Sequence, residues 1–151
     1  MTPEPQRITY DVSEVHGVKT LREQVSEPVL ASEIFERLRQ ATANNPDVLA
    51  ELCRDYLIEA RAAIEQIREA LAQANAGQLR DRAHYLKGSS MMLGARELAR
   101  CCATLEEMGR NSELDAAEPE LARAIAALKT VEAELSQQVG PVVLPEEGSA
   151  A

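Results

Sequence analysis

Aromatic residues are scarce in this sequence, and the shortage narrows the choice of fold. They make up 3% of the 151 residues, and tryptophan is absent. A β-sheet is therefore disfavoured, because strands are enriched in aromatic and β-branched side chains. Alanine, leucine, glutamate and arginine dominate instead, and these residues favour helices over strands when they occur together. The composition predicts helix-on-helix packing, in a chain long enough for one domain with a single core.

Cysteine is also scarce, with Cys53, Cys101 and Cys102 as its only occurrences. Their number and spacing fit neither a disulfide framework nor a zinc site. Adjacent residues on a helix point in different directions, so Cys101 and Cys102 are poorly placed to bind one metal ion. We expect small buried thiols in a reducing compartment and no metal site.

Long apolar runs are missing, and no stretch approaches the length of a membrane span. The N-terminus, Met-Thr-Pro-Glu-Pro, has neither the basic region nor the apolar run of a signal peptide. The net charge of −9 disfavours general binding to nucleic acids or to anionic membranes. We therefore expect a cytoplasmic monomer that binds neither nucleic acid nor membrane.

One stretch differs from this acidic average. Between residues 79 and 100, five basic side chains stand against only Asp81 and Glu97. A locally basic surface on an acidic protein could bind a partner that carries carboxylates or phosphate. For each arginine taken alone, a solvated face with scattered charges is an equally good interpretation. The basic residues are Arg80, Arg82, Lys87, Arg96 and Arg100.

Hydrophobic periodicity predicts five helices. The second has the clearest start, because Asn45 is a good N-cap and Pro46 suits the first helical position. Stop signals follow at residues 75–77, at Gly94 and at Gly109. The expected ranges are 26–28 or 32 to about 44, then 46 to about 74, 78–93, 95–108, and about 119–139 with Pro119 in the first turn.

These helices predict an all-α fold, an antiparallel four-helix bundle with the additional N-terminal helix laid across one end. The first helix has the apolar stripe Leu30, Ile34, Leu38 and Ala41, with Phe35 on its flank. We expect Phe35 in the core, with an exposed docking position as the alternative. The predicted domains are an N-terminal lead at 1–27, partly ordered or loose, the bundle at 28–139, and a flexible tail at 140–151.

The stretch from residue 84 to residue 95 contains the strongest candidates for functional residues. As a helix, it places His84, Lys87 and Gly88 on one face, because residues three and four apart are neighbours. Glycine in a helix interior costs about 1 kcal/mol relative to alanine. We interpret Gly88 as clearance for a partner that must reach the imidazole of His84. The opposite face, predicted to point into the core, carries Leu79, Leu86 and Leu93.

This stretch resembles the signature of histidine phosphotransfer (HPt) domains of multistep phosphorelays. That signature runs histidine, any residue, leucine, lysine, glycine, often two serines, then glycine and alanine. In this sequence the positions are His84, Leu86, Lys87, Gly88, Ser89, Ser90, Gly94 and Ala95. The family's next helix often carries a leucine, a cysteine and a Leu-Glu pair, here Leu98, Cys102, Leu105 and Glu106. The likeness covers roughly residues 28–139 and is strongest from 80 to 110.

The resemblance implies a phosphocarrier without its own ATP site, and so not an enzyme. His84 would accept a phosphoryl group from a receiver-domain aspartate and pass it to another response-regulator receiver. The lysine would neutralise charge on the phosphoryl oxygens. The resemblance also places Glu106 where family members often hydrogen-bond the imidazole. No cofactor is expected on this chain, and Mg²⁺ is expected in the partner receiver.

Three further side chains near His84 are candidates for binding the partner. Tyr85 and Met91 flank the site and could form an apolar docking rim, although ordinary partial burial is an equal alternative. Arg80 is a second candidate cation. We expect Ser89 and Ser90 to be small helix-contact residues whose hydroxyls bond the preceding turn.

Two other functions are alternatives to the phosphocarrier. A helical-bundle adaptor could dock receiver or kinase domains without carrying phosphate, but it would not need His84, Lys87 and Gly88 together. A metal-binding bundle lacks the paired Glu-x-x-His spacing. A complete histidine kinase is excluded because no glycine-rich ATP-binding element is present, and a receiver domain because strands do not alternate with helices.

Overall fold

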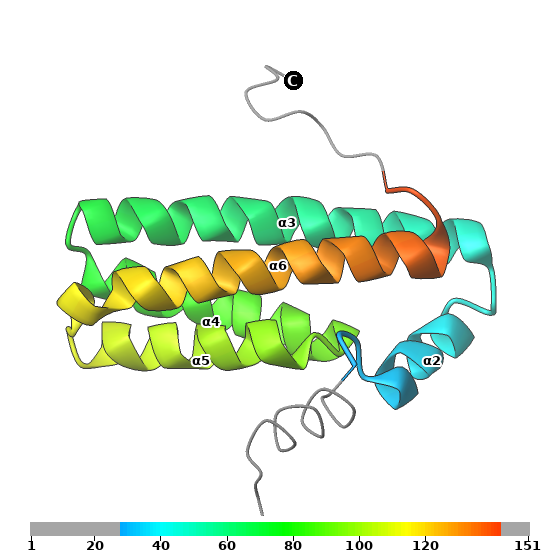
Figure 1. Cartoon of the computed structure of the whole chain (residues 1–151), viewed down its shortest axis with the longest axis horizontal. Coiled ribbons are helices and arrows are strands. Elements are labelled where there is room, and N and C mark those ends of the chain that lie inside the picture. The colour runs from blue at the N-terminus through cyan, green and yellow to red at the C-terminus, as the bar shows by residue number, and fades with distance from the viewer. Residues whose placement is uncertain (1–27, 143–151) are drawn as a thin grey trace, which may run out of the picture.

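The computed structural model of the protein describes residues 28–142, in which every regular element is helical. Four long helices form a bundle and a shorter one lies at one end (Figure 1). The predicted all-α class is confirmed, whereas the predictions for residues 1–27 and for the tail beyond residue 142 lie outside the described residues. The elements are α2 (Ser32–Ala41), α3 (Pro46–Ala72), α4 (Ala76–Leu93), α5 (Arg96–Arg110), the 3₁₀ turn η2 (Leu114–Ala116) and α6 (Ala117–Val139).

The four long helices are arranged so that α4 packs between α3 and α5, while α6 packs against α3 and α5. The seam between α4 and α5 therefore lies on the opposite side of the bundle from the seam between α3 and α6 (Figure 1). Short connections join consecutive helices, which makes neighbours antiparallel. Helix α2 contacts α3 and α4, and the amide of Ala31 donates to the carbonyl of Gly94 at 2.9 Å.

Asparagine side chains begin two of the helices. Oδ1 of Asn45 accepts from the amides of Asp47 at 3.0 Å and Val48 at 3.4 Å, which confirms the predicted cap of α3. Oδ1 of Asn75 accepts from the amide of Gln78 at 3.0 Å, so Asn75 begins α4 rather than ending α3. The predicted stop at residues 75–77 was wrong, because asparagine serves at both ends of helices and the turn comes earlier, at Ala74 with φ 53°.

The core is made of aliphatic side chains from all four bundle helices. The predicted inward face of α4 is confirmed, since Leu79, Leu86 and Leu93 are buried. All three cysteines are buried and unpaired, and burial raises the pKa of Cys102 to about 12. The thiols therefore stay protonated, which suits a packing role. Other fully buried side chains are Leu57, Ile67, Leu98, Leu105, Leu121 and Leu135.

The apolar face of α2 differs from the predicted stripe. Phe35 is buried and the guanidinium of Arg39 lies 5.2 Å from its ring centroid, so the alternative of an exposed docking phenylalanine is wrong. Ala41 is exposed, and Ala31 is buried in its place. The reason is that Ala31 precedes the helix and meets the end of α4 through its backbone, which places Phe35, four residues later, on the inward face.

Two glycines meet different structural demands. Gly94 ends α4 with φ 90°, as predicted for a C-cap. Gly109 was predicted to end the next helix, but α5 continues to Arg110 and Gly109 is buried inside it. A Cβ at Gly109 would lie 2.6 Å from the amide nitrogen of Arg80 and 2.9 Å from the carbonyl oxygen of Ala76. This glycine therefore allows the first turns of α4 to pack directly on α5.

Replacing Gly109 by alanine tests this close approach. The added methyl group would meet backbone atoms that cannot move independently, so Gly109→Ala should lower the free energy of unfolding by about 1–3 kcal/mol. Gly77→Ala is the matched control, because its Cβ would meet only Asn75 Oδ1, at 3.7 Å. The control should keep or raise stability by up to about 1 kcal/mol. Urea unfolding of both variants measures these changes in stability. If Gly109→Ala is as stable as the unsubstituted protein, α4 and α5 do not require glycine at this position.

Candidate functional site

Three of the predicted site residues, His84, Lys87 and Glu106, meet at the seam between α4 and α5. The side chain of His84 projects from α4 and is 67% exposed. Its Nδ1 lies 2.9 Å from Oε2 of Glu106 on α5. These residues are one helical turn from the close contact between Arg80 and Gly109. The packing of the two helices at that point therefore sets the distance between the imidazole and the carboxylate.

The carboxylate of Glu106 is the centre of the site. Its side chain is 8% exposed, and three nitrogen-bearing side chains surround it. Nζ of Lys87 lies 2.7 Å from Oε1, while Nδ1 of His84 and, at 3.1 Å, Nη2 of Arg110 share Oε2. The hydrogen bond from Lys87, followed by the one from His84, holds the pKa of Glu106 below its usual value. Glu106 is therefore an ionised acceptor at neutral pH.

This contact determines which ring nitrogen of His84 is available for chemistry. An ionised carboxylate can only accept hydrogen bonds, so the Nδ1 that faces Glu106 carries the ring proton. In the neutral imidazole the other nitrogen, Nε2, then keeps its lone pair. The exposed imidazole therefore offers Nε2 as a nucleophilic atom, and the Glu106 contact at Nδ1 fixes the orientation of the ring.

The surface one turn from His84 is open. A Cβ added at Gly88 would meet no atom within 4 Å beyond its own helix backbone and chain neighbours. Gly88 is thus not required by helix packing, in contrast to Gly109. The open position agrees with the interpretation that the glycine leaves room for a partner beside the imidazole.

Lys87 and Arg110 differ from what the sequence suggested. Lys87 was expected as an exposed, flexible cation, but it is half-buried and paired with Glu106. Arg110 was not predicted at all. Its signal was present in the sequence, because Arg110 follows Glu106 by four residues and such pairs meet on one helix face.

Of the two serine hydroxyls, only that of Ser89 bonds the preceding turn as predicted. Oγ of Ser89 donates to the carbonyl of Leu86 at 3.3 Å, so it bonds the preceding turn as expected. Ser90 is wholly buried, and its Oγ lies 2.8 Å from the hydroxyl of Tyr56 on α3. Ser90 is a small helix-contact residue as predicted, but its hydroxyl bonds the buried phenol of Tyr56 instead of the preceding turn.

A comparison with known protein families identifies the family to which this chain belongs. The family model described as the Hpt domain matches residues 51–138, which is more than half of the chain and includes every residue of the His84 site. The chain belongs to the Hpt domain family. Membership gives this Hpt domain a role in histidine phosphotransfer within phosphorelays. No curated protein matches it in sequence.

Two solved structures resemble the Hpt domain described here. One is histidine-containing phosphotransfer protein B (HptB) from Pseudomonas aeruginosa PAO1, with 26% identity and a TM-score of 0.70, over 75% of this chain and 96% of that one. The other is a putative histidine-containing phosphotransfer protein from rice, with 21% identity and a TM-score of 0.64, over 81% and 89%. The second likeness concerns the fold alone.

The predicted docking rim of the Hpt domain is exposed. Tyr85 and Met91 both have large exposed fractions, and the Tyr85 hydroxyl donates to Glu59, whose hydrogen bond raises the pKa of Tyr85. Arg80 is exposed but pairs with Asp81 at 3.0 Å. Three further exposed apolar side chains on α3 and α4 were not predicted, namely Val48, Leu52 and Met92.

The locally basic stretch is less basic in the structure than in the sequence. Arg96 pairs with Glu33 at 3.1 Å, and Arg100 pairs with Glu97 at 3.0 Å. Together with the Arg80 pair and the Lys87 contact to Glu106, these contacts balance most of the positive charge. The interpretation as scattered, solvated charges therefore fits better than a continuous basic surface.

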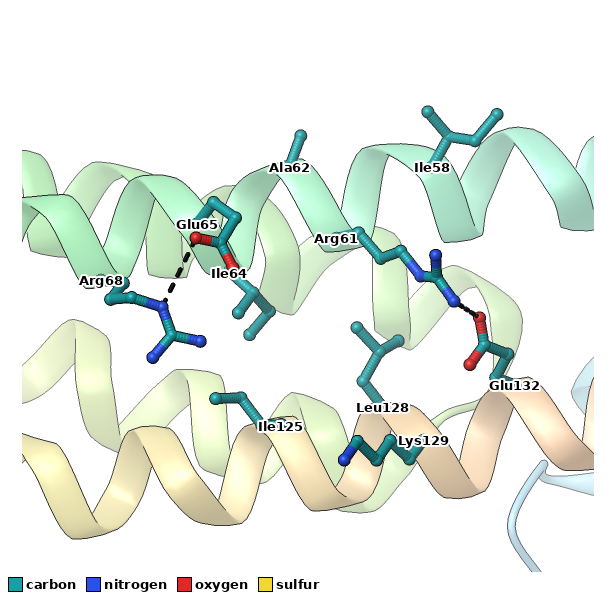
Figure 2. Close-up of a pocket in the computed structure, with 10 residues that line it drawn as sticks. All are labelled: Ile58, Arg61, Ala62, Ile64, Glu65, Arg68, Ile125, Leu128, Lys129 and Glu132. Carbon is teal, nitrogen blue, oxygen red and sulfur yellow. Dashed lines mark hydrogen bonds and ion pairs between the residues drawn. The ribbon is translucent and has the colours of Figure 1, made fainter. Parts of the chain in front are cut away.

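A cavity lies away from His84, between α3 and α6. It has a volume of about 550 Å³, with Ile64 and Leu128 among its apolar lining residues (Figure 2). Two ion pairs border it, Arg61 with Glu132 across the two helices and Arg68 with Glu65 along α3 (Figure 2). None of the predicted site residues lines this cavity.

Residues 28–142 contain neither a candidate metal site nor a candidate membrane span. This range contains no group of three or more His, Cys, Asp or Glu side chains that could hold a metal ion. None of its helices is both long and apolar enough to cross a membrane.

The ionised state of Glu106 predicts a pH-dependent contribution to stability. Its folded-state pKa lies below the ordinary 4.5, so its stabilising effect is complete above that value and disappears as pH falls through the lowered pKa. At pH 7, Glu106→Gln should lower the free energy of unfolding by about 1–3 kcal/mol, because charge-assisted hydrogen bonds are lost.

Denaturant unfolding across the acidic range measures this effect. The gap between the unsubstituted protein and Glu106→Gln should close as pH drops below 4.5. Glu51→Gln, at an exposed position of α3 outside this network, is the control and should change stability by only about 0.5 kcal/mol. A gap of the same size at every pH would contradict the assignment.

Proposed function

We propose that this Hpt domain is a phosphocarrier that takes a phosphoryl group from a receiver-domain aspartate onto Nε2 of His84 and passes it to another response-regulator receiver. The contact of Nδ1 with the buried Glu106 carboxylate carries the proposal, because it leaves Nε2 as the exposed nucleophile. A surface histidine without such a partner would have no fixed tautomer.

The proposed step balances without an added base. The Nε2 lone pair forms a bond to phosphorus, and the bond from phosphorus to the aspartyl oxygen breaks, which returns the aspartate carboxylate. The ring keeps its Nδ1 proton and gains positive charge as the new bond forms. The Glu106 carboxylate, 2.9 Å from Nδ1, stabilises that charge. Reversal of the same step returns the group to a second receiver.

Lys87 supports the charge of the phosphoryl group in this proposal. Its Nζ is held by Oε1 of Glu106, one turn from His84. An ammonium group has three donors, so Lys87 can keep this contact and also donate to an equatorial phosphoryl oxygen. Phosphoryl transfer depends mainly on such positioning and charge neutralisation.

The partner supplies what this chain is proposed not to carry. We propose that the receiver binds the Mg²⁺ ion of the reaction, and that the carrier uses neither an ATP site nor a cofactor of its own. The exposed Tyr85 and Met91 beside His84 suit docking of a receiver surface, with Arg80 as an additional polar contact. We further propose that the carrier acts as a cytoplasmic monomer.

The alternative is an adaptor that docks receiver or kinase domains without carrying phosphate. The exposed apolar side chains near His84 would serve an adaptor equally well. An adaptor would not need an ionised carboxylate buried beneath an exposed imidazole, since an unpaired exposed histidine requires no such support. The Glu106 contact therefore favours the carrier.

Labelling tests which residue receives the phosphoryl group. Incubation with a phosphorylated receiver should give an acid-labile, base-stable phosphoprotein, and His84→Gln should abolish the label while circular dichroism shows unchanged helical content. The chain has two histidines, so His16→Gln is the matched control and should retain the label. Label that survives in His84→Gln would overturn the assignment.

Gly88 tests whether the open surface is needed for access. Gly88→Ala should fold normally, with stability raised by up to about 1 kcal/mol, because its Cβ meets nothing and alanine favours the helix. Gly88→Gln should also fold, but its long side chain would lie beside His84 and slow transfer by roughly tenfold or more, as misplaced reactants do.

Thermal melts and receiver-to-His84 transfer rates measure the two effects separately. Ala126→Gln adds the same side chain to an exposed position of α6 and should leave transfer unchanged. A folded Gly88→Gln protein that transfers as fast as the unsubstituted one would refute the clearance argument.

A further inference from the structure

Arg110 shares an atom with the proposed reaction centre without touching the imidazole. Its Nη2 donates to Oε2 of Glu106 at 3.1 Å, and the same oxygen lies 2.9 Å from Nδ1 of His84. Lys87 occupies the other oxygen, Oε1. Each carboxylate oxygen is therefore held by one permanent cation, and the imidazole meets the oxygen that Arg110 holds.

A single cation would not determine how this carboxylate faces the ring. A glutamate side chain has several rotatable bonds, and its terminal torsion is broad and roughly two-fold. With Lys87 alone, the carboxylate could turn about its contact at Oε1 and withdraw Oε2 from Nδ1. Contacts at both oxygens fix the plane of the group, in the way that partners behind a ligand orient it.

Arg110 is itself held in place by its neighbours on α5. Nη1 of Arg110 contacts Glu107, and Nδ2 of Asn111 donates to the other carboxylate oxygen of Glu107 at 3.2 Å. A line of polar contacts thus runs from the end of α5 through Arg110 to Glu106. The guanidinium is suited to this position because its donors have a fixed planar geometry.

We infer that Arg110 is a positioning residue, which fixes the Glu106 carboxylate with Oε2 towards Nδ1 of His84 and so keeps Nε2 free for phosphoryl transfer. The effect on transfer rate rests on the proposed function, whereas the effect on the imidazole does not. Arg110 is half-exposed, and surface ion pairs add little to stability. Its contribution should therefore appear in the state of the ring rather than in folding.

Two other roles for Arg110 predict different results. As an ordinary surface pair, it would affect neither the imidazole nor the transfer rate. As a docking residue that contacts the receiver directly, it would change the receiver concentration needed for half-maximal rate, and would do so even without Glu106. Variants of Arg110 in two backgrounds separate these possibilities.

The first readout is the ring tautomer of His84 in the ¹⁵N-labelled full chain, measured by NMR at mildly alkaline pH without any partner. The unsubstituted protein should show predominantly the Nδ1–H form. Arg110→Ala should shift the ring towards a mixture of both tautomers, and Arg110→Lys should restore most of the Nδ1–H form. Arg123→Ala removes an arginine from a comparable Arg–Glu pair on α6 and should leave the tautomer unchanged.

The second readout is single-turnover transfer from a phosphorylated receiver at a series of receiver concentrations. Arg110→Ala should slow the saturating rate by roughly tenfold, equivalent to about 1.4 kcal/mol, with little change in the half-saturating concentration. In a Glu106→Ala background, Arg110→Ala should cause almost no further loss, because residues that act through one group are non-additive.

Two results would overturn the positioning role of Arg110. An unchanged tautomer in Arg110→Ala would overturn it, and so would a rate loss of the same size in the Glu106→Ala background. If the unsubstituted protein accepts no phosphoryl group, the proposed function fails, and the tautomer measurement still decides the role of Arg110.

Discussion

The site depends on one buried negative charge. An ionised carboxylate removed from water is strongly unfavourable unless charged partners and hydrogen bonds replace the lost hydration. Glu106 has those partners in Lys87 and Arg110, and His84 completes the set. Because His84 and Lys87 on α4 must both reach the carboxylate on α5, the site requires one register of α4 against α5. The exposed imidazole owes its orientation to this requirement, because its Nδ1 is held by the Glu106 carboxylate.

Helix packing provides the register that the carboxylate needs. Gly109 brings the backbones of α4 and α5 together one turn from His84, and the buried leucines of α4 hold the opposite face in the core. At the other end of α4, Gly94 makes room for the backbone of Ala31 and so joins α2 to the bundle. A nucleophile on a rigid helix, supported from a second helix, is placed more precisely than one on a loop.

The sequence allowed the parts of the site that lie on one helix to be predicted. The shared face of His84, Lys87 and Gly88 follows from 3.6 residues per turn, which is a local property. Contacts between helices depend on register, which periodicity does not specify, so Glu106 entered only through the family resemblance and the pair of Tyr56 with Ser90 was missed. Gly109 was misread for a related reason: glycine both ends helices and permits close packing, and only the neighbouring backbone distinguishes the two.

A carrier must release the phosphoryl group as readily as it accepts it, and the network around Glu106 fits this requirement. In the proposed step, a carboxylate beside Nδ1 stabilises the positive charge that the ring gains when the bond to phosphorus forms. A carboxylate with no other partner would stabilise the phosphorylated ring most strongly and would slow the return of the group. Lys87 and Arg110 share the same negative charge, and so reduce what Glu106 contributes to the ring. If the proposed function holds, the two cations would do more than offset burial, because they would bring the free energies of the loaded and unloaded histidine closer together, as transfer in both directions requires.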